Sequence, residues 1–430
     1  DAGSITEIEL PGPAGAPVLG LMVHGDVQPV DEKAWRIPPF AGVVRDGRVW
    51  GRGAADDKGP LVQALLSMAA LKDAGPPRTH AIRLLVGSDE ESGSTDVATY
   101  LKTHAPPDYS LVLDSAFPVV IGEKAWDGLT VSADPVERAP DKPWTVTAVE
   151  GGLAPSIVPD RARLVLRWRE GEPRWSELVA RLVARTPPAG TQIEITTRGD
   201  ALEVLAHGRA AHAGVNLEGG RNALVALARV IEGELPKSGA DDLLAFVRFA
   251  GRDLHGTALG LPQDTWGGYA VNIATLGTHT SLAPAEEGKL TLVINLRRPP
   301  PLTAPQARER LFAVVNDFSA RRGAQLRPAG FFADEPLAFD RHAKIVRRLM
   351  DSYRRVTGQD DPPAISGGGT YAKRLPRSIA FGMWFPEKPY PGHDTDEQIP
   401  IADLQRGAHV LIEAVVDLAC SDPLRDPFAP

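Results

Sequence analysis

Continuously apolar runs alternate with helix-like segments in the first part of the chain. Pro60 stands in the first turn of one predicted helix, and Gly75 follows the end of that helix. The order of strand, helix and strand, with strands that are apolar throughout, indicates a mostly parallel sheet covered on both faces. We predict strands at 18–23, 81–88 and 109–115, and helices at 60–73 and 94–103.

Beyond residue 122 the pattern changes to alternating apolar and polar positions, which is typical of half-exposed strands. The predicted elements are strands at 144–150, 162–170, 191–198, 201–208, 269–277 and 290–297, and helices at 173–186, 219–233, 304–320 and 341–356. An apolar strand at 378–385 and a helix at 401–418 then return to the first pattern. We therefore predict an α/β domain formed by 1–121 and 366–430, interrupted by a large α+β domain of two halves at 122–365.

Length and charge narrow the class of protein. A chain of 430 residues exceeds the usual size of one hydrophobic core, so two domains are expected. The net charge of -8, without a basic block, argues against a nucleic-acid partner, and the longest apolar runs are too short to cross a membrane. Cys420 is the only cysteine, so no intrachain disulfide can form. We expect a cytoplasmic protein, with a periplasmic or secreted location after removal of an N-terminal signal as the alternative.

The run LMVHGDVQP places His24 and Asp26 two residues apart at the end of the first apolar strand. In extended backbone, residues i and i+2 point to the same face. A neutral imidazole can ligate a metal there while a carboxylate fixes its tautomer, although an ordinary surface pair has the same spacing. Glu90, Glu91 and Asp114 also follow strands, and ligands bind beyond the carboxyl ends of such sheets.

Further acidic clusters extend the candidate site. In GRGAADDKGP, glycines frame Asp56 and Asp57, which would be an ordinary helix-capping turn if they stood alone. Beside His24, however, a carboxylate on this turn is suited to bridge two cations. In DEES, the adjacent Glu90 and Glu91 diverge in direction, so one can bind metal while the other acts as a base, although isolated Glu pairs are usually solvated.

Two more residues complete the inventory. Asp114 ends the apolar run YSLVLDS, where a carboxylate is costly unless it is paired or bound to metal. His393 lies in the loop PYPGHDTDEQIP. Imidazole and carboxylate ligands without a thiolate suit Zn²⁺, with Mn²⁺ or Co²⁺ as alternatives. Two metals that share a carboxylate would hold a hydroxide and polarise a carbonyl at neutral pH.

The ordered motifs HGDVQP, GRGAADDKGP, SDEESGS, LVLDS and PGHDTDE resemble those of the co-catalytic dizinc peptidases. This family includes aminoacylase, carboxypeptidase G, succinyl-diaminopimelate desuccinylase, carnosinase and dipeptidase V, and the resemblance runs from residue 20 to 415. It implies a zinc-peptidase catalytic domain, a cis Asp56–Asp57 peptide and an inserted lid domain. The implied roles are one zinc on His24 and Asp114, a second on Glu91 and His393, a bridge by Asp56, a general base at Glu90, and Asp26 as the residue that orients His24.

A narrower resemblance lies in and after the insertion. AHAGVNLEGGRNA is similar to the family's lid segment, which implies that His212 polarises the scissile carbonyl. GRDLHGTALGLPQDTWGGYAVNIATLG and SGGGTYAKRLP look like the dipeptidase V branch, which implies contacts to the substrate's terminal carboxylate from Arg297, Gly368, Gly369 and Thr370. An Arg fork accepts a carboxylate bidentately, whereas the plain alternative for Arg297 and Arg298 is a charged strand end.

The chain also departs from the family pattern. In GGLAPSIVPD, Ser156 stands where relatives carry Asn, and a hydroxyl cannot copy the paired contacts of an amide, so recognition of the substrate backbone is expected to differ. Only 23 residues precede His24, so we expect the family's N-terminal helical layer to be shortened or to lie outside this sequence.

The resemblance implies hydrolysis of a dipeptide with a free N-terminus by two Zn²⁺ ions, with Mn²⁺ or Co²⁺ as alternatives. Deacylation of N-acyl amino acids and carboxypeptidase action on small peptides remain alternatives, and a metal-free binding protein is an alternative from another class. Because the insertion is about twice as long as the lids that pair in homodimeric members, we expect a monomer, with a homodimer as the alternative.

Overall fold

The computed structural model describes residues 4–30, 32–263, 266–278, 288–388, 390 and 392–430. The chain divides into two compact units, and each is described by itself. Unit 1 comprises Asp1–Glu123 and Pro336–Pro430, and unit 2 comprises Lys124–Glu335. Residues 264–265 of the segment GRDLHGTALGLPQDTWGGYAVNIATLG, and 389 and 391 of the His393 loop, lie outside the described residues.

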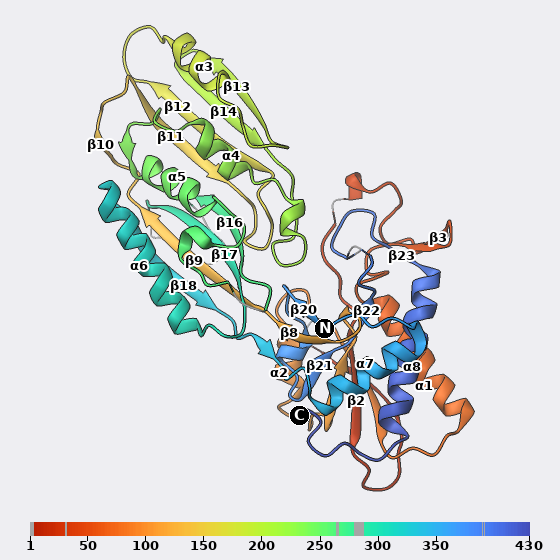
Figure 1. Cartoon of the computed structure of the whole chain (residues 1–430). Coiled ribbons are helices and arrows are strands. Elements are labelled where there is room, and N and C mark those ends of the chain that lie inside the picture. The colour runs from red at the N-terminus through yellow and green to blue at the C-terminus, as the bar shows by residue number, and fades with distance from the viewer. Residues whose placement is uncertain (1–3, 31, 264–265, 279–287, 389, 391) are drawn as a thin grey trace. The chain divides into compact units, whose positions relative to one another are not determined.

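Unit 1 is built on a five-stranded sheet of the described residues (Figure 1). The strand order is β1 (Thr6–Leu10), β5 (Ala81–Gly87), β2 (Val18–His24), β6 (Tyr109–Val112) and β21 (Ser378–Ala380). All neighbours pair in parallel except β1, which runs antiparallel to β5. The carboxyl ends of β2, β5 and β6 therefore meet at one edge, as the apolar runs predict.

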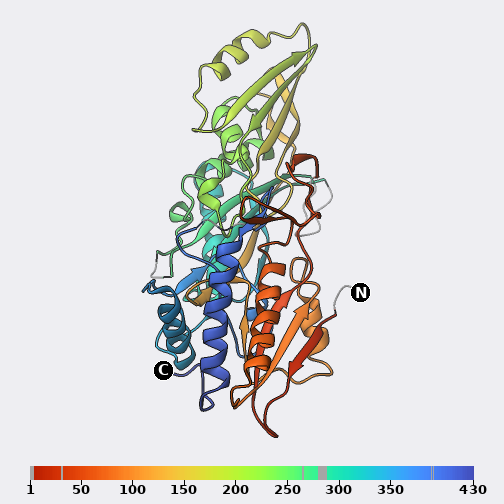
Figure 2. The same ribbon diagram turned by 90° about the vertical axis from the view of Figure 1, so that its right-hand side faces the viewer.

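Alternate residues of these strands enter two different apolar clusters, so the sheet is covered on both faces. Leu21 and Leu111 pack against α1 (Lys58–Ala74), α7 (Lys344–Thr357) and α8 (Ile401–Ala419). Met22 and Val112 pack on the other side against α2 (Thr95–Tyr100) and the short helix η4 (Tyr371–Lys373). Helices α1 and α8 lie side by side in Figures 1 and 2. The predicted α/β class is confirmed.

Short strands beyond the main sheet shape the loops at its edge. The predicted strand at 378–385 is interrupted at Gly382, which has a positive φ of 79°, and continues as β22. These elements are β3 (Val43–Arg45), β4 (Arg48–Trp50), β7 (Ser115–Ala116), β8 (Val120–Glu123), β19 (Leu337–Ala338), β20 (Ala364–Ser366), β22 (Met383–Trp384), β23 (Gln398–Pro400) and the helix η1 (Glu32–Ala34). Strand β23 pairs with β4 and so brings the segment after His393 beside the segment before Asp56.

Unit 2 contains an antiparallel eight-stranded sheet of the described residues, shown in Figure 1. Its order is β13 (Gln192–Arg198), β14 (Ala201–His207), β12 (Arg161–Trp168), β11 (Trp144–Gly151), β16 (Ala270–Gly277), β17 (Leu290–Arg298), β9 (Ala125–Ala133) and β18 (Arg327–Ala333). The other elements are α3 (Trp175–Val183), α4 (Ala223–Val230), α5 (Gly239–Ala250), α6 (Ala304–Arg322), β10 (Glu137–Ala139), β15 (Lys237–Ser238), η2 (Leu217–Gly219) and η3 (Thr257–Leu259). Helices α3 to α6 share one apolar core with the sheet.

The two halves of this sheet meet at a narrow seam between β11 and β16, where Gly151 pairs with Leu276. Gly152 follows with a φ of 77°, and a Cβ atom there would lie 1.9 Å from the carbonyl oxygen of Ala274. Only glycine fits such a close approach. The predicted two halves are therefore one continuous sheet with one core.

Helix α7 differs from its predicted place. The sequence pattern places 341–356 in the insertion, but Ile345, Val346 and Leu349 join the core of unit 1 together with Val410 of α8. The amphipathic pattern predicts the helix correctly but does not say which sheet it covers. In the described part of the chain, no helix combines the length and apolar character that crossing a membrane requires.

Candidate functional site

Strand ends and one helix start bring the predicted ligands of unit 1 together. His24 is the last residue of β2, Glu90 and Glu91 follow β5, and Asp114 follows β6. Asp56 lies two residues before the start of α1, and the Asp56–Asp57 peptide is cis, which confirms that prediction. His393 lies in the loop between β22 and β23.

Asp56 lies between the two histidines. Its Oδ1 atom is 2.9 Å from Nε2 of His24, and its Oδ2 atom is 2.9 Å from Nε2 of His393. Asp114 Oδ2 lies 3.8 Å from His24 Nε2, and a carboxylate oxygen of Glu91 lies 3.1 Å from His393 Nε2. A single carboxylate thus faces one imidazole with each oxygen, which is the arrangement of a bridging ligand.

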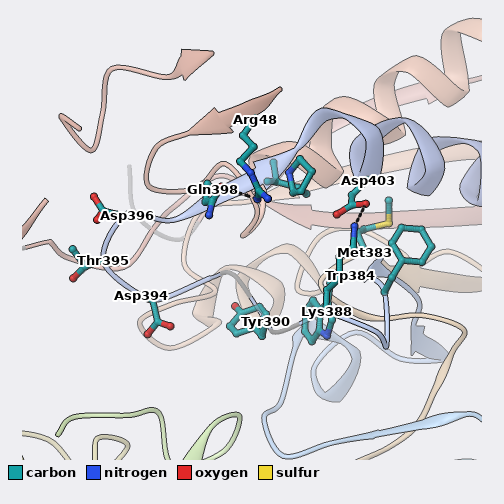
Figure 3. A pocket seen from close by; sticks show the side chains of 13 residues that line it. Arg48, Met383, Trp384, Lys388, Tyr390, Asp394, Thr395, Asp396, Gln398 and Asp403 are labelled. Atoms are coloured by element: carbon teal, nitrogen blue, oxygen red, sulfur yellow. Dashed lines mark hydrogen bonds and ion pairs between the residues drawn. The ribbon is translucent and has the colours of Figure 1, made fainter. Parts of the chain in front are cut away.

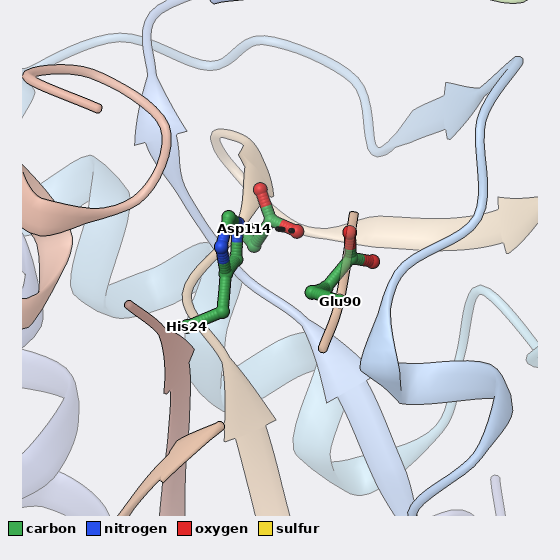
Figure 4. A group of neighbouring side chains, drawn as sticks. All are labelled: His24, Glu90 and Asp114. Carbon is green, nitrogen blue, oxygen red and sulfur yellow. Dashed lines mark ion pairs between the residues drawn. The ribbon is translucent and has the colours of Figure 1, made fainter. Parts of the chain in front are cut away.

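Among the described residues, two sets of ligand atoms, each within 4.8 Å of one another, can hold a metal ion: His24, Glu90 and Asp114, and His24, Asp56 and Glu91. Figure 4 shows the three side chains of the first set close together, each on a separate segment of the chain. Imidazole nitrogens and carboxylate oxygens without sulfur fit Zn²⁺, Mn²⁺ or Co²⁺. The residues present therefore fit the predicted metal, while their individual roles stay predictions.

The electrostatics of the cluster also favour a bound cation. Burial, with help from neighbouring carboxylates, raises the pKa of Glu90 to about 8 and raises that of Asp114 well above its usual range. Burial alone would lower the pKa of His393, but hydrogen bonds with Asp56 and Glu91 raise it to about 10. Crowded carboxylates of this kind are relieved by positive charge.

Asp26 fixes both His24 and the turn that carries the two glutamates. Nδ1 of His24 lies 3.0 Å from the carbonyl oxygen of Asp26 and 3.4 Å from its carboxylate. The Nδ1–H group therefore donates to Asp26, which leaves Nε2 free to ligate a metal. The Asp26 carboxylate also accepts the backbone N–H groups of Glu90 and Glu91, at 3.2 and 3.0 Å. This second role was not predicted.

A buried ion pair joins the Asp56 turn to the His393 loop. Nη1 of Arg52 lies 2.7 Å from Oε2 of Glu397, and the two side chains are 4% and 0% exposed. The Glu397 carboxylate also accepts the backbone N–H groups of Gly53, Ala55 and Asp56, at 2.8 to 3.1 Å. Sequence reasoning missed Arg52 and Glu397, although both lie inside the motifs that carry the ligands.

Tyr390 links the centre to a pocket in unit 1. Its hydroxyl donates to Oδ2 of Asp56. The pocket has a volume of about 530 Å³, and Met383, Trp384 and Ile399 contribute its apolar lining. Figure 3 shows the Arg48–Gln398 hydrogen bond and the Lys388–Asp403 ion pair at separate parts of its rim. Tyr390 was also missed by the sequence analysis.

The glycine-rich loop of unit 1 holds a buried carboxylate of the protein itself. Thr370 donates through its hydroxyl and its backbone N–H group to Glu123, at 2.7 and 3.0 Å. The same hydroxyl accepts the N–H group of Ala372. Gly368 donates to the hydroxyl of Ser366. The Thr370 side chain is thus engaged inside the protein, and Gly368 and Gly369 contribute backbone groups only.

His212 lies in unit 2 with a defined tautomer. Its Nδ1 atom accepts the backbone N–H groups of Gly214 and Val215, both at 3.2 Å. A nitrogen that accepts carries no proton in the neutral ring, so Nε2 is the donor. The adjacent segment contains Ser156, whose hydroxyl accepts from the Trp126 indole at 3.4 Å and whose carbonyl accepts from Ala213.

The arginines at the end of β17 have different surroundings. Arg298 is fully buried and donates to Asp127, at 2.7 Å, and to the carbonyl oxygens of Leu302 and Asp334. Arg297 is 4% exposed, and its Nε atom has no hydrogen-bond partner within the described residues. Burial lowers the pKa of Arg297 to about 10, which still leaves it charged at neutral pH. Arg298 is therefore structural, while the role of Arg297 stays a prediction.

Comparisons with known proteins identify a peptidase family, sequence relatives and proteins of similar fold. Residues 20–417 match the model of peptidase family M20/M25/M40. The putative dipeptidase YtjP of Bacillus subtilis is 28% identical over 94% of this chain and 84% of its own length, and a putative dipeptidase of Staphylococcus epidermidis is 27% identical over 95% and 84%. Human carnosine dipeptidase 1 has a similar fold, with a TM-score of 0.54 at 14% identity over 96% of this chain and 82% of its own. The dipeptidase Dug1p of Saccharomyces cerevisiae also has a similar fold, with a TM-score of 0.53 at 13% identity over 96% of this chain and 82% of its own.

Proposed function

Because the chain belongs to peptidase family M20/M25/M40, we propose that it is a metal-dependent dipeptidase that hydrolyses dipeptides with a free N-terminus. The observation that carries the proposal is the Asp56 carboxylate, which faces His24 with one oxygen and His393 with the other. The names of the curated relatives support the dipeptide as substrate.

We propose that two Zn²⁺ ions bind per chain, with Mn²⁺ or Co²⁺ as alternatives. His24 and Asp114 would hold one ion and Glu91 and His393 the other, while Asp56 would bridge them, in keeping with the distances given above. When bound, such ions polarise a peptide carbonyl and lower the pKa of a water molecule.

Glu90 is proposed as the general base and acid. Its carboxylate belongs to the group formed with His24 and Asp114, yet the pairing of Glu91 with His393 leaves Glu90 available for proton transfer. Glu90 would take a proton from the attacking water and return it to the leaving amine when the C–N bond breaks.

His212 is proposed to stabilise the negative charge that develops on the carbonyl oxygen. The backbone N–H groups of Gly214 and Val215 hold its Nδ1 atom, so that Nε2–H is the donor without any proton rearrangement. A donor oriented in advance costs no reorganisation during the reaction. Ser156 is proposed to contact the substrate backbone, because its hydroxyl accepts from Trp126 and, within the described residues, keeps its own proton.

Arg297, with the loop of Gly368, Gly369 and Thr370, is proposed to bind the terminal carboxylate of the substrate; the N–H groups of Gly368 and Thr370 already donate to Ser366 and Glu123, so Arg297 is the main donor. We expect Arg297→Ala to lower kcat/KM for dipeptides about 10- to 100-fold, because a charge-assisted hydrogen bond is lost. The variant should also lose the preference for a dipeptide over its C-terminal amide, which competing hydrolysis assays measure. Undiminished preference in Arg297→Ala would place the carboxylate elsewhere.

We also propose that the active protein is a monomer in which His212 acts within its own chain. A mixture of His212→Ala and Glu90→Gln chains is then expected to recover no activity, because neither chain has a complete set of groups. Light scattering on the same mixture gives the mass. Activity above that of the separate variants would show that the histidine acts on a partner's site.

The decisive test of the function is a substrate panel. Purified protein stripped of metal would be supplied with Zn²⁺, Mn²⁺ or Co²⁺ and given a dipeptide, the corresponding tripeptide and pentapeptide, and an N-acyl amino acid. We expect metal-dependent turnover of the dipeptide, with slower turnover of longer peptides. Hydrolysis of the N-acyl amino acid alone, or turnover that needs no metal, would refute the proposal.

A further inference from the structure

Tyr371 directly follows the glycine-rich loop and is the first residue of η4. Its side chain is completely buried. The hydroxyl donates to Oδ2 of Asp96, at 2.5 Å, and accepts the backbone N–H group of Asp89, at 3.4 Å. The phenol therefore joins a segment near residue 370 to the turn that follows β5.

The contact between this phenol and β5 leaves no room for a side chain. A Cβ atom on Gly87, the last residue of β5, would lie 2.1 Å from the Tyr371 hydroxyl oxygen and 2.6 Å from Cζ of the same ring. The phenol ring is fixed in the core, so glycine is the residue that permits this approach. Tyr371 thus lies directly against the backbone from which the Glu90 turn departs.

The turn itself is held at every backbone N–H group from residue 88 to 91. Asp26 accepts from Glu90 and Glu91. At the other end, Ser88 donates to Oδ2 of Asp96, at 2.8 Å, and Asp89 donates to Tyr371. The Tyr371–Asp96 pair therefore holds the first half of the turn, at residues 88 and 89, and Asp26 holds the second half, at residues 90 and 91.

We propose that Tyr371 is a positioning residue that sets the direction of Glu90 and Glu91 by holding the first half of their turn. This inference rests on the proposed function, because it takes Glu90 as the base and Glu91 as a metal ligand. Without the hydroxyl, the Asp89 N–H group loses its acceptor and Asp96 loses a donor. The turn then samples directions in which Glu90 is misplaced for proton transfer, and small misplacements reduce rates strongly.

Tyr371→Phe tests the proposal, with Tyr353→Phe as the matched control. Tyr353 is also fully buried in unit 1, and its hydroxyl donates to Asp361 at 2.6 Å, outside the proposed site. With saturating metal, we expect Tyr371→Phe to lower kcat about tenfold with KM changed less than twofold. Tyr353→Phe should keep the wild-type kcat. The thermal unfolding midpoints of Tyr353→Phe and Tyr371→Phe should fall by similar amounts, because each variant loses one buried hydroxyl.

Two measurements do not depend on turnover. Amide hydrogen exchange at residues 88–91 should be faster in Tyr371→Phe than in wild type or Tyr353→Phe. Calorimetric titration with Zn²⁺ should show several-fold weaker binding, because Glu91 shares the turn. Exchange and kcat equal to those of the Tyr353→Phe control would overturn the proposal.

Gly87→Ala disturbs the same contact between Tyr371 and β5, because the added methyl group displaces the phenol. The double variant Gly87→Ala with Tyr371→Phe should lose no more kcat than the worse single variant. Additive losses would show that the two residues act separately and would contradict the proposal. The proposed function is tested separately. If wild type cleaves dipeptides and Glu90→Gln does not, then wild-type kcat and hydrogen exchange in Tyr371→Phe would reject only the positioning role of Tyr371.

Discussion

Glu90→Gln is expected to lower kcat for dipeptides about 10²- to 10⁴-fold while the metal content stays at the wild-type value. The amide keeps the shape of the side chain but cannot take the proton from water. The backbone N–H group of Glu90 still donates to Asp26, so the turn should keep its position. Steady-state kinetics and elemental analysis on the same preparation measure both quantities.

The neighbouring Glu91→Gln is the matched comparison. Glu91 contacts His393 and accepts from Gln28, at 2.7 Å, so its replacement removes a proposed metal ligand. We expect lower metal occupancy, with activity partly restored by excess metal. Wild-type turnover in Glu90→Gln, or metal loss from that variant instead of from Glu91→Gln, would refute the assignment of roles.

Glu397→Gln should destabilise unit 1 by about 3–5 kcal/mol, because it leaves the buried Arg52 charge without its partner. The same substitution weakens the acceptor of the N–H groups before Asp56, so metal affinity should fall as well. Urea unfolding of the metal-free protein measures the first effect, and a titration with Zn²⁺ measures the second.

Arg167→Met is the control for this ion pair. Arg167 bonds Asp200 at 2.7 Å, but the two side chains are 55% and 51% exposed. Exposed pairs contribute about 0–1 kcal/mol, so this variant should unfold close to the wild-type urea concentration. Equal destabilisation by Glu397→Gln and Arg167→Met would mean that burial of the Arg52–Glu397 pair carries no special weight.

The elements that the sequence predicted best are those in which the pattern of apolar residues matches the burial of the element in the fold. Strands β2 and β5 are mostly apolar and mostly buried, so a simple pattern describes them. Helix α5 was missed because its run LLAFVRFA is nearly continuous in apolar residues, a pattern that a short buried strand shares. Strand β9 was missed because Asp127 and Gly128 disfavour strands, while pairing with β17 and β18 overrides this preference.

The candidate site also contains residues that could be predicted from the sequence and residues that could not. Ligand candidates could be predicted because they stand at strand ends and in motifs that resemble a known family. Arg52, Glu397 and Tyr371 could not, because their roles depend on contacts between distant segments. Arg52 and Glu397 are 345 residues apart, and Asp89 and Tyr371 are 282 apart. Spacing along one sequence carries no sign of such contacts.

The division of unit 1 into two chain segments has a consequence for synthesis. Unit 2 is one continuous stretch with its own core, so it can fold as soon as it leaves the ribosome. Unit 1 must wait for β21 to pair with β6 and for α8 to cover α1. Glu397, which lies just before α8, must also reach the Asp56 turn to complete the proposed metal centre. A nascent chain therefore carries a complete insertion before the second segment of unit 1 and the residues that it adds to the proposed metal centre have been made.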